Sequence, residues 1–374
     1  MVLKYVCAAI AILVSYLVYS IVTLTDIGKT VSLKNSEKCE KLPIDMPTED
    51  LAIFGNFLIG ATFDAIPAFH FHLGAAHCKP GSLISINPST KSVKPIPTHG
   101  FPAEFQLNAH GIKLHNNKTL YVISHGYAKG GERIHLFDLS VVDGDVHATF
   151  KESFYFEGDH GMYNGLALVD ENHFYLTQWI PFPDTEAGRD NSKVVSLYRI
   201  LTLLFRSVCP IKFCTVVGKG LVKCEDKAFG KMPNGVQYED KRLYVADSCE
   251  KSIRVYRVLE NFDLEIIEKV SVSHSVDNIW LEDGKVYVAG INRIWDFVQY
   301  GEGIRAGKGH LNVPGGASKV FFDNGRWNAE VLLMQESLSL PASAIPFNGK
   351  LILSSIDEPS ILICSDLASL APTP

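Results

Sequence analysis

Five oxygen-bearing side chains recur at one place in a repeated sequence pattern, and their types are those that bind a hard metal ion. Two are carboxylates and three are amides: Glu49, Asp277, Asn164, Asn234 and Asn278. Each is followed by a short run of mostly apolar residues. Ca²⁺ takes about six to eight oxygen ligands, and this set offers five side-chain ligands with two negative charges. The residues therefore predict a calcium site, with water or substrate completing the shell.

The elements that would bring these residues together are six copies of one pattern. Each copy has a polar residue or pair, an alternating apolar run, a turn rich in Asn, Asp, Gly or Lys, and a second apolar run. The copies open at Glu49-Asp50, His110-Gly111, Asn164-Gly165, Asn234-Gly235, Asp277-Asn278 and, more faintly, Ser343.

Each copy predicts two β-strands joined by a tight turn, and further strands such as 252–258 would complete a sheet. Copies several tens of residues apart are typical of four-stranded blades arranged around an axis. We therefore predict an all-β fold, a six-bladed β-propeller over residues 39–374. Its innermost strands would gather the polar openings at one end of a central channel. Two packed β-sandwiches would use the same strands but would not explain the repeated polar openings.

Each polar opening also has a local explanation, because Asn-Gly and Asp-Asn are common turn pairs. Their recurrence at the same phase of the repeat is what favours a shared metal site. Zinc is disfavoured because no pair of Cys or His residues has zinc-ligand spacing. Cys209 and Cys214 lack a matching second pair, and they suit a local disulfide or buried thiols.

The composition excludes two classes of protein. Of the 374 residues, 47% are hydrophobic and 20% are charged, which is typical of a globular chain and not of a disordered one. The net charge of −6 provides no basic surface for nucleic acid, so no nucleic-acid partner is expected.

The N-terminal segment predicts a membrane anchor. Residues 5–25 carry no charge over 21 residues, which is about the length needed to cross the ~30 Å hydrocarbon core. No small-residue cleavage pattern stands out near its end, so we expect an uncleaved signal-anchor, with a cleaved signal peptide as the alternative. The predicted order is a short cytosolic N-terminus at 1–4, a transmembrane segment at 5–25, a linker at 26–38 and the propeller. This order gives a single-pass type II membrane protein whose propeller lies in the lumen of the endoplasmic reticulum or outside the cell.

An oxidising compartment would permit glycosylation and disulfides. Asn117 opens an N-glycosylation acceptor, Asn117-Lys118-Thr119. Of the eight cysteines Cys7 lies in the anchor, which leaves an odd number and at least one unpaired thiol. Cys39 precedes the first copy and Cys364 follows the last, so a bridge between them would tie the propeller's ends together; two unrelated thiols are the alternative. The pairing is left open for Cys78, Cys209, Cys214, Cys224 and Cys249.

In the order and spacing of its motifs the chain resembles the paraoxonase (arylesterase/lactonase) family of calcium-dependent six-bladed propellers. The resemblance runs from Cys39 through LNAHGIKL, PNGV, LYVAD and SVDNI to Cys364. It implies a catalytic calcium held by the same five residues that the repeat singles out.

The resemblance implies two further features. A histidine pair, His110 and His125, would activate water as a general base, with His125 orienting His110. A second, structural calcium would use Asp50, the main-chain carbonyl of Ile112 and an aspartate after the first Asn ligand. That last position is Gly165 here, so the second site is expected to be weakened or lost.

Other positions depart from the family pattern or are ambiguous. Gln178-Trp179-Ile180 stand where the family commonly has Asn-Asp-His, and a pocket histidine is replaced near Ile291, which puts the family's substrates in doubt more than its calcium. The segment 199–205 suits either an amphipathic lid on the membrane or an ordinary core segment. A metal role is disfavoured for three alternating histidines, His70, His72 and His77.

The predicted function is hydrolysis of lactones or aryl esters by a membrane-anchored enzyme, with Ca²⁺ polarising the carbonyl and His110 and His125 activating water. Its partner would be a small hydrophobic ester or lactone. The alternative is a non-catalytic chaperone or accessory subunit whose clients are membrane proteins such as ion channels, because fold and metal do not fix function. The anchor and Gly165 favour this alternative, whereas the histidine pair favours catalysis. A sugar-lactone hydrolase of the gluconolactonase type is disfavoured by the anchor and the end-to-end cysteines.

Overall fold

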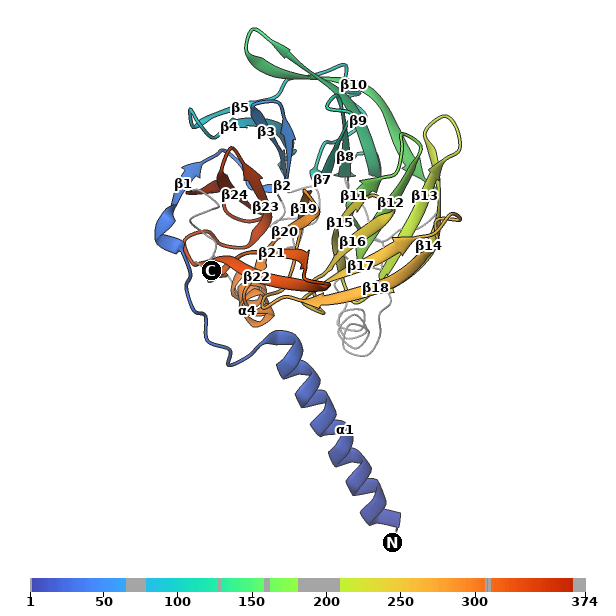
Figure 1. The fold of residues 1–374 in the computed structure, drawn as a ribbon, viewed down its shortest axis with the longest axis vertical. Helices are drawn as coiled ribbons and strands as arrows, with labels where there is room; N and C mark the ends of the chain where they lie inside the picture. Colours follow the sequence, from blue (N-terminus) through green and yellow to red (C-terminus); the bar gives the residue numbers. More distant parts are fainter. Residues whose placement is uncertain are drawn as a thin grey trace.

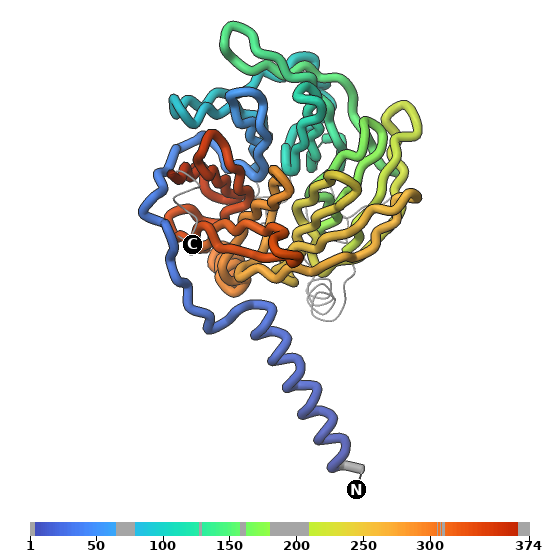
Figure 2. The backbone as a smooth tube through the Cα atoms, in the orientation of Figure 1, coloured from blue at the N-terminus to red at the C-terminus, as the bar shows by residue number. Residues whose placement is uncertain are grey.

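The computed structural model describes residues 2–64, 79–126, 129–157, 162–180, 209–306, 308 and 311–365. Over these residues a long N-terminal helix leads into antiparallel sheets set around a ring (Figure 1). The chain visits the sheets in sequence order around that ring (Figure 2). The predicted all-β, six-bladed propeller is confirmed, and two packed sandwiches are excluded.

The first three blades each contain four main strands, ordered from the channel outward. They are β2 (Thr48–Phe54), β3 (Phe57–Thr62), β4 (Ser82–Asn87) and β5 (Ser92–Pro95); β7 (Ala109–His115), β8 (Thr119–Gly126), β9 (Gly131–Val142) and β10 (Asp145–Phe156); and β11 (Met162–Leu168), β12 (His173–Ile180), β13 (Cys209–Val216) and β14 (Leu221–Gly230). A short strand, β6 (Thr98–His99), pairs with β10.

The last three blades follow the same plan, and the sixth is completed by the first strand of the chain. They are β15 (Pro233–Glu239), β16 (Arg242–Asp247), β17 (Ser252–Val258) and β18 (Leu264–Ser271); β19 (Ile279–Glu282), β20 (Lys285–Ile291), β21 (Gly315–Asp323) and β22 (Arg326–Gln335); and β23 (Pro341–Phe347), β24 (Lys350–Ser355), β25 (Ser360–Cys364) and β1 (Cys39–Pro43).

The innermost strands β2, β7, β11, β15, β19 and β23 form a closed ring, since each contacts the next and β23 contacts β2. Glycines follow several polar openings because these strands approach closely. A Cβ atom at Gly111 would lie 2.1 Å from the main-chain oxygen of Asn164, and one at Gly235 would lie 2.6 Å from the main-chain nitrogen of Ile279. Side chains are excluded at these two contacts, and the neighbouring openings meet around the channel.

The core lies between neighbouring blades and follows the two-residue period of the strands. On β8, Leu120 and Val122 pack into the cluster shared with the first blade, whereas Tyr121 and Ile123 pack into the cluster shared with the third. A cluster of this kind joins each pair of neighbouring blades, so every blade is held from both sides and the polar residues at its inner edge are fixed in position.

The ring is closed by antiparallel pairing of β1 with β25, in which Cys39 is the register partner of Cys364. A disulfide joins these two residues across a sequence separation of 325. A second disulfide joins Cys214 to Cys224 within the hairpin of β13 and β14. Among the described cysteines, the free thiols are Cys7, Cys209 and Cys249. Cys78 lies outside the described residues.

Helix α1 (Val2–Thr25) projects away from the propeller (Figure 1). Its Lys4–Thr25 segment is long and apolar enough to cross a bilayer, a property shared by signal sequences. The chain that follows α1 is held against the propeller, because Lys251 pairs with Asp26 at 2.6 Å and Arg293 donates to the carbonyl of Lys29 at 3.0 Å. Helix α4 (Ile294–Arg305) begins beside this attachment and contacts α1.

Candidate metal centre and histidine relay in the central channel

The five predicted metal ligands meet at one end of the channel. Glu49, Asn164 and Asn234 stand near the starts of β2, β11 and β15, and Asp277 and Asn278 immediately precede β19. All are buried except Asp277, which is half-buried. We call this set of five residues the ligand ring.

Four oxygens of the ligand ring are buried and have no hydrogen-bond partner among the described residues. They are Oε2 of Glu49, Oδ1 of Asn164, Oδ1 of Asn234 and Oδ1 of Asp277. A buried polar atom without a partner costs about 1–3 kcal/mol, and more if it is charged. These four oxygens, three from inner strands and one from Asp277 two residues before β19, are the donor type that a hard cation prefers. The ligand ring therefore fits Ca²⁺.

The surroundings of Asp277 in the ligand ring oppose its ionisation. Burial raises the pKa of Asp277 well above its usual range, and the charge of Glu49 raises it further. Asn278 donates from Nδ2 to Oε1 of Glu49 at 2.9 Å. A cation placed between two such carboxylates would remove the cost of keeping both ionised.

Zinc-type chemistry finds no matching group in the described part of the chain. No cluster of three or more His, Cys, Asp or Glu side chains suitable for a metal occurs there. His70, His72 and His77 lie outside the described residues. The ligand ring differs from a zinc site because most of its donors are amides.

A histidine relay begins beside the ligand ring. Nε2 of His110 lies 3.0 Å from Oε1 of Glu49, and Nδ1 of His110 is hydrogen bonded to Nε2 of His125. Nδ1 of His125 lies 2.7 Å from Oε2 of Glu132. Both histidines are buried, and the ring of Phe63 covers them at centroid distances of 6.1 and 5.8 Å.

Glu132 completes this relay and is absent from the sequence prediction. Its other oxygen, Oε1, accepts the main-chain N–H of Tyr163 at 2.9 Å, which fixes the carboxylate. The missed signal lies in the hairpin of β8 and β9, where Gly126 pairs with Gly131 and His125 stands directly opposite Glu132. Opposed residues of a hairpin point to the same face of the sheet, so the pair could have been found from the turn.

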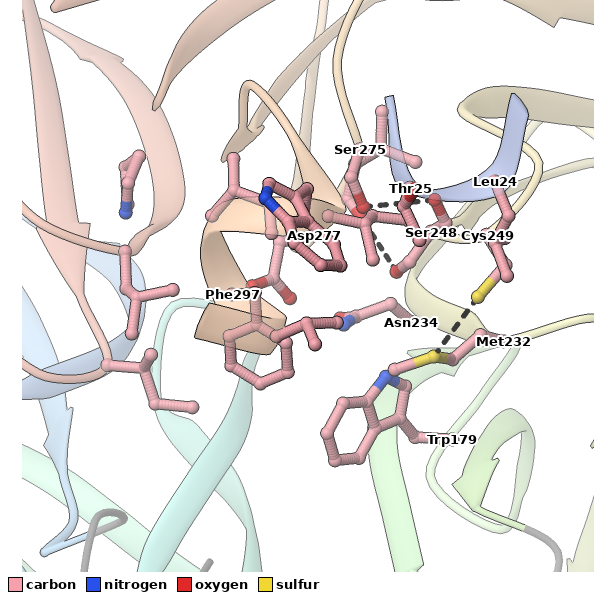
Figure 3. Close-up of a pocket in the computed structure, with 18 of the residues that line it drawn as sticks. Leu24, Thr25, Trp179, Met232, Asn234, Ser248, Cys249, Ser275, Asp277 and Phe297 are labelled. Carbon is pink, nitrogen blue, oxygen red and sulfur yellow. Dashed lines mark hydrogen bonds between the residues drawn. The ribbon is translucent and has the colours of Figure 1, made fainter. Parts of the chain in front are cut away.

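A largely apolar cavity of about 440 Å³ opens onto the ligand ring. Asn234 and Asp277 supply polar groups in its wall and point toward each other, with Trp179 and Phe297 close by (Figure 3). Leu24 of helix α1 lies on the side of Cys249 in the same view. The cavity thus lies between the metal ligands and the end of the N-terminal helix.

The positions that depart from the family pattern lie on this cavity. Trp179, at the end of β12, and Ile291, at the end of β20, both line it. Trp295 and Val298 of α4 extend the apolar surface. Changes at these positions therefore alter the wall of the cavity and leave the ligand ring in place. The segment 199–205, considered as a lid, lies outside the described residues.

The residues assigned to a second calcium are arranged differently. Oδ2 of Asp50 accepts the main-chain N–H of Ile112 at 2.9 Å. Oδ1 of Asp50 accepts the N–H of Leu51 at 2.8 Å and lies 2.9 Å from the hydroxyl of Ser343. Burial raises the pKa of Asp50 to about 6, although these donors oppose the shift. Gly165 supplies no side-chain oxygen, so this set does not fit a second calcium.

The glycosylation acceptor lies away from the ligand ring. Asn117 is exposed in the turn between β7 and β8, at the end of β7 opposite to His110. Its φ of 48° places it in the left-handed region that Asn tolerates.

Solved structures similar to this chain include proteins described as lactonases and as a lyase. A putative gluconolactonase is 12% identical with a TM-score of 0.49, covering 89% of this chain and 93% of that one. A putative 6-phosphogluconolactonase from Bacteroides fragilis is 12% identical with a TM-score of 0.46, covering 82% and 90%. Virginiamycin B lyase from Staphylococcus aureus is 9% identical with a TM-score of 0.43, covering 88% and 99%. At these scores the similarities bear on no individual residue of the site.

No curated protein matches the chain. The family model described as Arylesterase matches residues 43–291, which is more than half of the chain and contains the whole ligand ring and both relay histidines. The chain belongs to the arylesterase (paraoxonase) family of ester and lactone hydrolases.

Proposed function

We propose that this protein is a calcium-dependent hydrolase of hydrophobic lactones or aryl esters, held at a membrane surface by α1. The observation that carries the proposal is the set of four buried oxygens without partners in the ligand ring. Native proteins rarely leave several such atoms together unless a ligand meets them. The family and the adjoining apolar cavity are consistent with this function.

The ligand ring would hold Ca²⁺ through its five side chains. When bound there, the ion would polarise the substrate carbonyl and stabilise negative charge on its oxygen. Asn234 and Asp277 line the cavity, so these ligands would lie closest to the substrate. The remaining ligands lie deeper in the channel and would mainly hold the ion.

The histidine relay would move the proton of the attacking water. If His125 donates from Nδ1 to Glu132 and accepts Nδ1–H of His110, Nε2 of His110 is the nitrogen left to take a proton at the ligand ring. Water gives one proton to this nitrogen while its oxygen adds to the carbonyl carbon. When the ester C–O bond breaks, the departing oxygen takes the proton back from His110. Glu132 stabilises the positive charge that the two imidazoles share meanwhile.

The cavity wall selects for apolar substrates. Its lining combines Trp179, Trp295 and Phe297 with aliphatic side chains, and Ile21 and Leu24 of α1 contribute to it. An ester or lactone with an apolar chain would bury that chain here and place its carbonyl near Asn234 and Asp277. Because Ile21 and Leu24 belong to the apolar segment that would cross the membrane, such substrates could reach the cavity from the bilayer.

The disulfides support an oxidising compartment for the propeller. Cys39–Cys364 and Cys214–Cys224 would form and persist in an oxidising compartment, so the propeller would lie in the lumen or outside the cell and the N-terminus in the cytosol. The exposed Asn117 acceptor would then be available for glycosylation.

Turnover by the purified full chain tests the proposal directly. Lactones of increasing chain length and phenyl acetate would be supplied with Ca²⁺ or with EGTA, alongside the thermal midpoint Tm. We expect turnover that is lost in EGTA and restored by Ca²⁺, with better turnover for longer apolar chains. No turnover on any substrate at saturating Ca²⁺ would contradict a hydrolase of this class.

One observation favours a second function. His110 is only 1% exposed, and both of its ring nitrogens have partners, so it is poorly placed to meet water in this state. A non-catalytic chaperone or accessory subunit for membrane proteins would use the ion for stability alone. Its signature in the same experiment is a large fall in Tm with EGTA without turnover, together with client membrane proteins in detergent extracts.

A further inference from the structure

Below the ligand ring the channel contains a second charged layer, formed by Asp50, Lys113 and Gln237. We call it the lower level. Asp50 follows Glu49 by one residue on β2, while Lys113 and Gln237 follow His110 and Asn234 by three residues on β7 and β15. The three side chains therefore come from three inner strands.

Lys113 reaches across the channel. Its Nζ donates to Oε1 of Gln237, which belongs to a blade that is not adjacent to that of Lys113. The same Nζ lies 6.0 Å from the ring centroid of Trp280 on β19. Gln237 in turn donates from Nε2 to the carbonyl of Ile279 at 3.0 Å. The ammonium group is thereby fixed among the second, fourth and fifth blades.

Lys113 forms no direct ion pair with Asp50, but the two residues share this layer: Ile112, which precedes Lys113 on β7, donates its main-chain N–H to Asp50 at 2.9 Å. Within the layer, the charges of Asp50 and Glu239 favour the ammonium form of Lys113. Asp50 sits inside the channel with both oxygens occupied by donors from Leu51, Ile112 and Ser343. Neither oxygen of Asp50 belongs to the buried atoms without partners, in contrast to the four oxygens of the ligand ring. The hydrogens directed at Asp50 occupy positions that a metal ion would need.

Gly165 also disfavours a metal in the lower level. A metal site here would need a second carboxylate, but a Cβ atom at Gly165 would lie 3.1 Å from the main-chain oxygen of Asn234 and 3.2 Å from the main-chain nitrogen of Val236. Such contacts are tighter than side chains ordinarily make, so β11 and β15 would have to separate slightly to admit one. Gly165 therefore supplies no ligand, and the packing of the two strands disfavours a larger residue at this position.

We propose that the Lys113 ammonium is the fixed cation that neutralises Asp50, so that the lower level binds no metal and the chain binds a single Ca²⁺ at the ligand ring. The count of one rests on the proposed function, but the role of Lys113 does not. A lysine held by cross-channel contacts would do what a structural ion does in such a layer: its positive charge balances a buried carboxylate in the same layer, and its contacts link several blades.

The first experiment counts the ions. The full chain in detergent, stripped with EGTA and dialysed against ⁴⁵Ca²⁺, is expected to bind one ion per chain. Two ions of similar affinity would overturn the proposal. No bound ion would contradict the proposed function but leave the role of Lys113 to be decided by the second experiment.

The second experiment measures Tm in EGTA, where the ligand ring cannot contribute an ion. Lys113→Met should lower Tm by roughly 5 °C or more, because it leaves Asp50 without a cation. Lys113→Arg keeps the charge and should recover part of the loss. The matched control is Lys223→Met, which alters an exposed lysine on β14 and should leave Tm close to that of the parent chain.

A double variant distinguishes neutralisation of Asp50 from simple packing. Asp50→Asn should restore much of the Tm lost in Lys113→Met, because the charge that Lys113 meets is then absent. Equal Tm values for the Lys113→Met and Lys223→Met variants, or additive losses in the double variant, would overturn the proposal. If Lys113→Met does not fold, Lys113→Arg is compared with and without Asp50→Asn. In that background Asp50→Asn should lower Tm, because it leaves a buried cation without a balancing charge.

Discussion

The ligand ring and the lower level lie next to each other in one channel, yet they meet the same physical problem in different ways. Both bury carboxylates, and burial raises the pKa of both Asp277 and Asp50. Around Asp50 the chain provides N–H and O–H donors and a lysine. Around Asp277 and Glu49 it leaves oxygens without partners.

The difference shows that the hydrogen-bond partners of a buried carboxylate indicate whether a bound ligand is expected beside it. A satisfied carboxylate needs nothing more, so its layer serves stability. A carboxylate that faces another carboxylate and unpartnered amides is stable only with a cation between them. Of the two adjacent residues, Glu49 therefore belongs to the proposed metal site, whereas Asp50 contributes to stability.

The largest expected effect comes from removing one charge from the ligand ring. Asp277→Asn should weaken Ca²⁺ binding by about 100-fold or more and abolish turnover, because two carboxylates provide the whole charge of the site. In EGTA, however, the same variant should melt at a higher temperature than the parent chain, since it removes a buried charge that lacks a cation. Calorimetric titration and Tm measurements check both signs.

Asp50→Asn is the matched variant in the lower level. It should leave Ca²⁺ affinity close to that of the parent chain but lower Tm both with Ca²⁺ and with EGTA, because Lys113 loses its partner. If the two variants behaved alike, the contrast between the two layers would be wrong.

A smaller effect is expected from the far end of the histidine relay. Glu132→Gln removes a hydrogen bond between charged groups worth about 1.5–3 kcal/mol, which corresponds to a roughly 10- to 100-fold fall in kcat. Ca²⁺ affinity should not change, because Glu132 is not a ligand. His110→Gln should give a larger loss in kcat, and the exposed Glu152→Gln on β10 serves as a control. A normal kcat in both relay variants would remove the relay from the mechanism.

The last expected effect concerns a buried histidine outside the ligand ring and the histidine relay. His274 is fully buried, and burial lowers its pKa to about 4. Its Nδ1 donates to the main-chain carbonyl of Ser275, and its Nε2 is hydrogen bonded to the hydroxyl of Ser318. The unfolded chain binds a proton at this residue below about pH 6.5, so stability should fall as pH drops from about 6.5 to about 4, by about 3 kcal/mol. Urea unfolding in EGTA across this range should show a flatter profile in His274→Gln than in the parent chain or in the exposed His99→Gln. An unchanged profile would assign the acid sensitivity to other groups.

Much of the fold could be predicted from the sequence because it rests on local regularities. Alternating apolar runs and turn residues recur six times, and a period of two residues predicts strands whatever their neighbours are. The same phase placed Glu49, His110, Asn164, Asn234 and Asn278 at the starts of inner strands. A closed ring of blades then requires the first and last strands of the propeller to pair, as β1 and β25 do.

Glu132 and Lys113 could not be found in the same way. Neither residue stands at the repeated position of the pattern. The role of Glu132 depends on the register of a hairpin, and the role of Lys113 depends on a contact across the channel. A contact between non-adjacent blades leaves no periodic trace in the sequence. The apolar cavity is a similar case, since it combines α1, α4 and the ends of several blades.

The sequence by itself determined the number of blades, the oxygen-bearing residues at the inner strands and the apolar N-terminal helix, because each depends on residue type and spacing along the chain. The tertiary structure alone decided which oxygens stay without partners, which residue Lys113 reaches across the channel, and where the cavity lies. All three features depend on distances across the channel. The repeat in the sequence predicts which residues lie near the channel axis, but it does not predict which of them contact each other there.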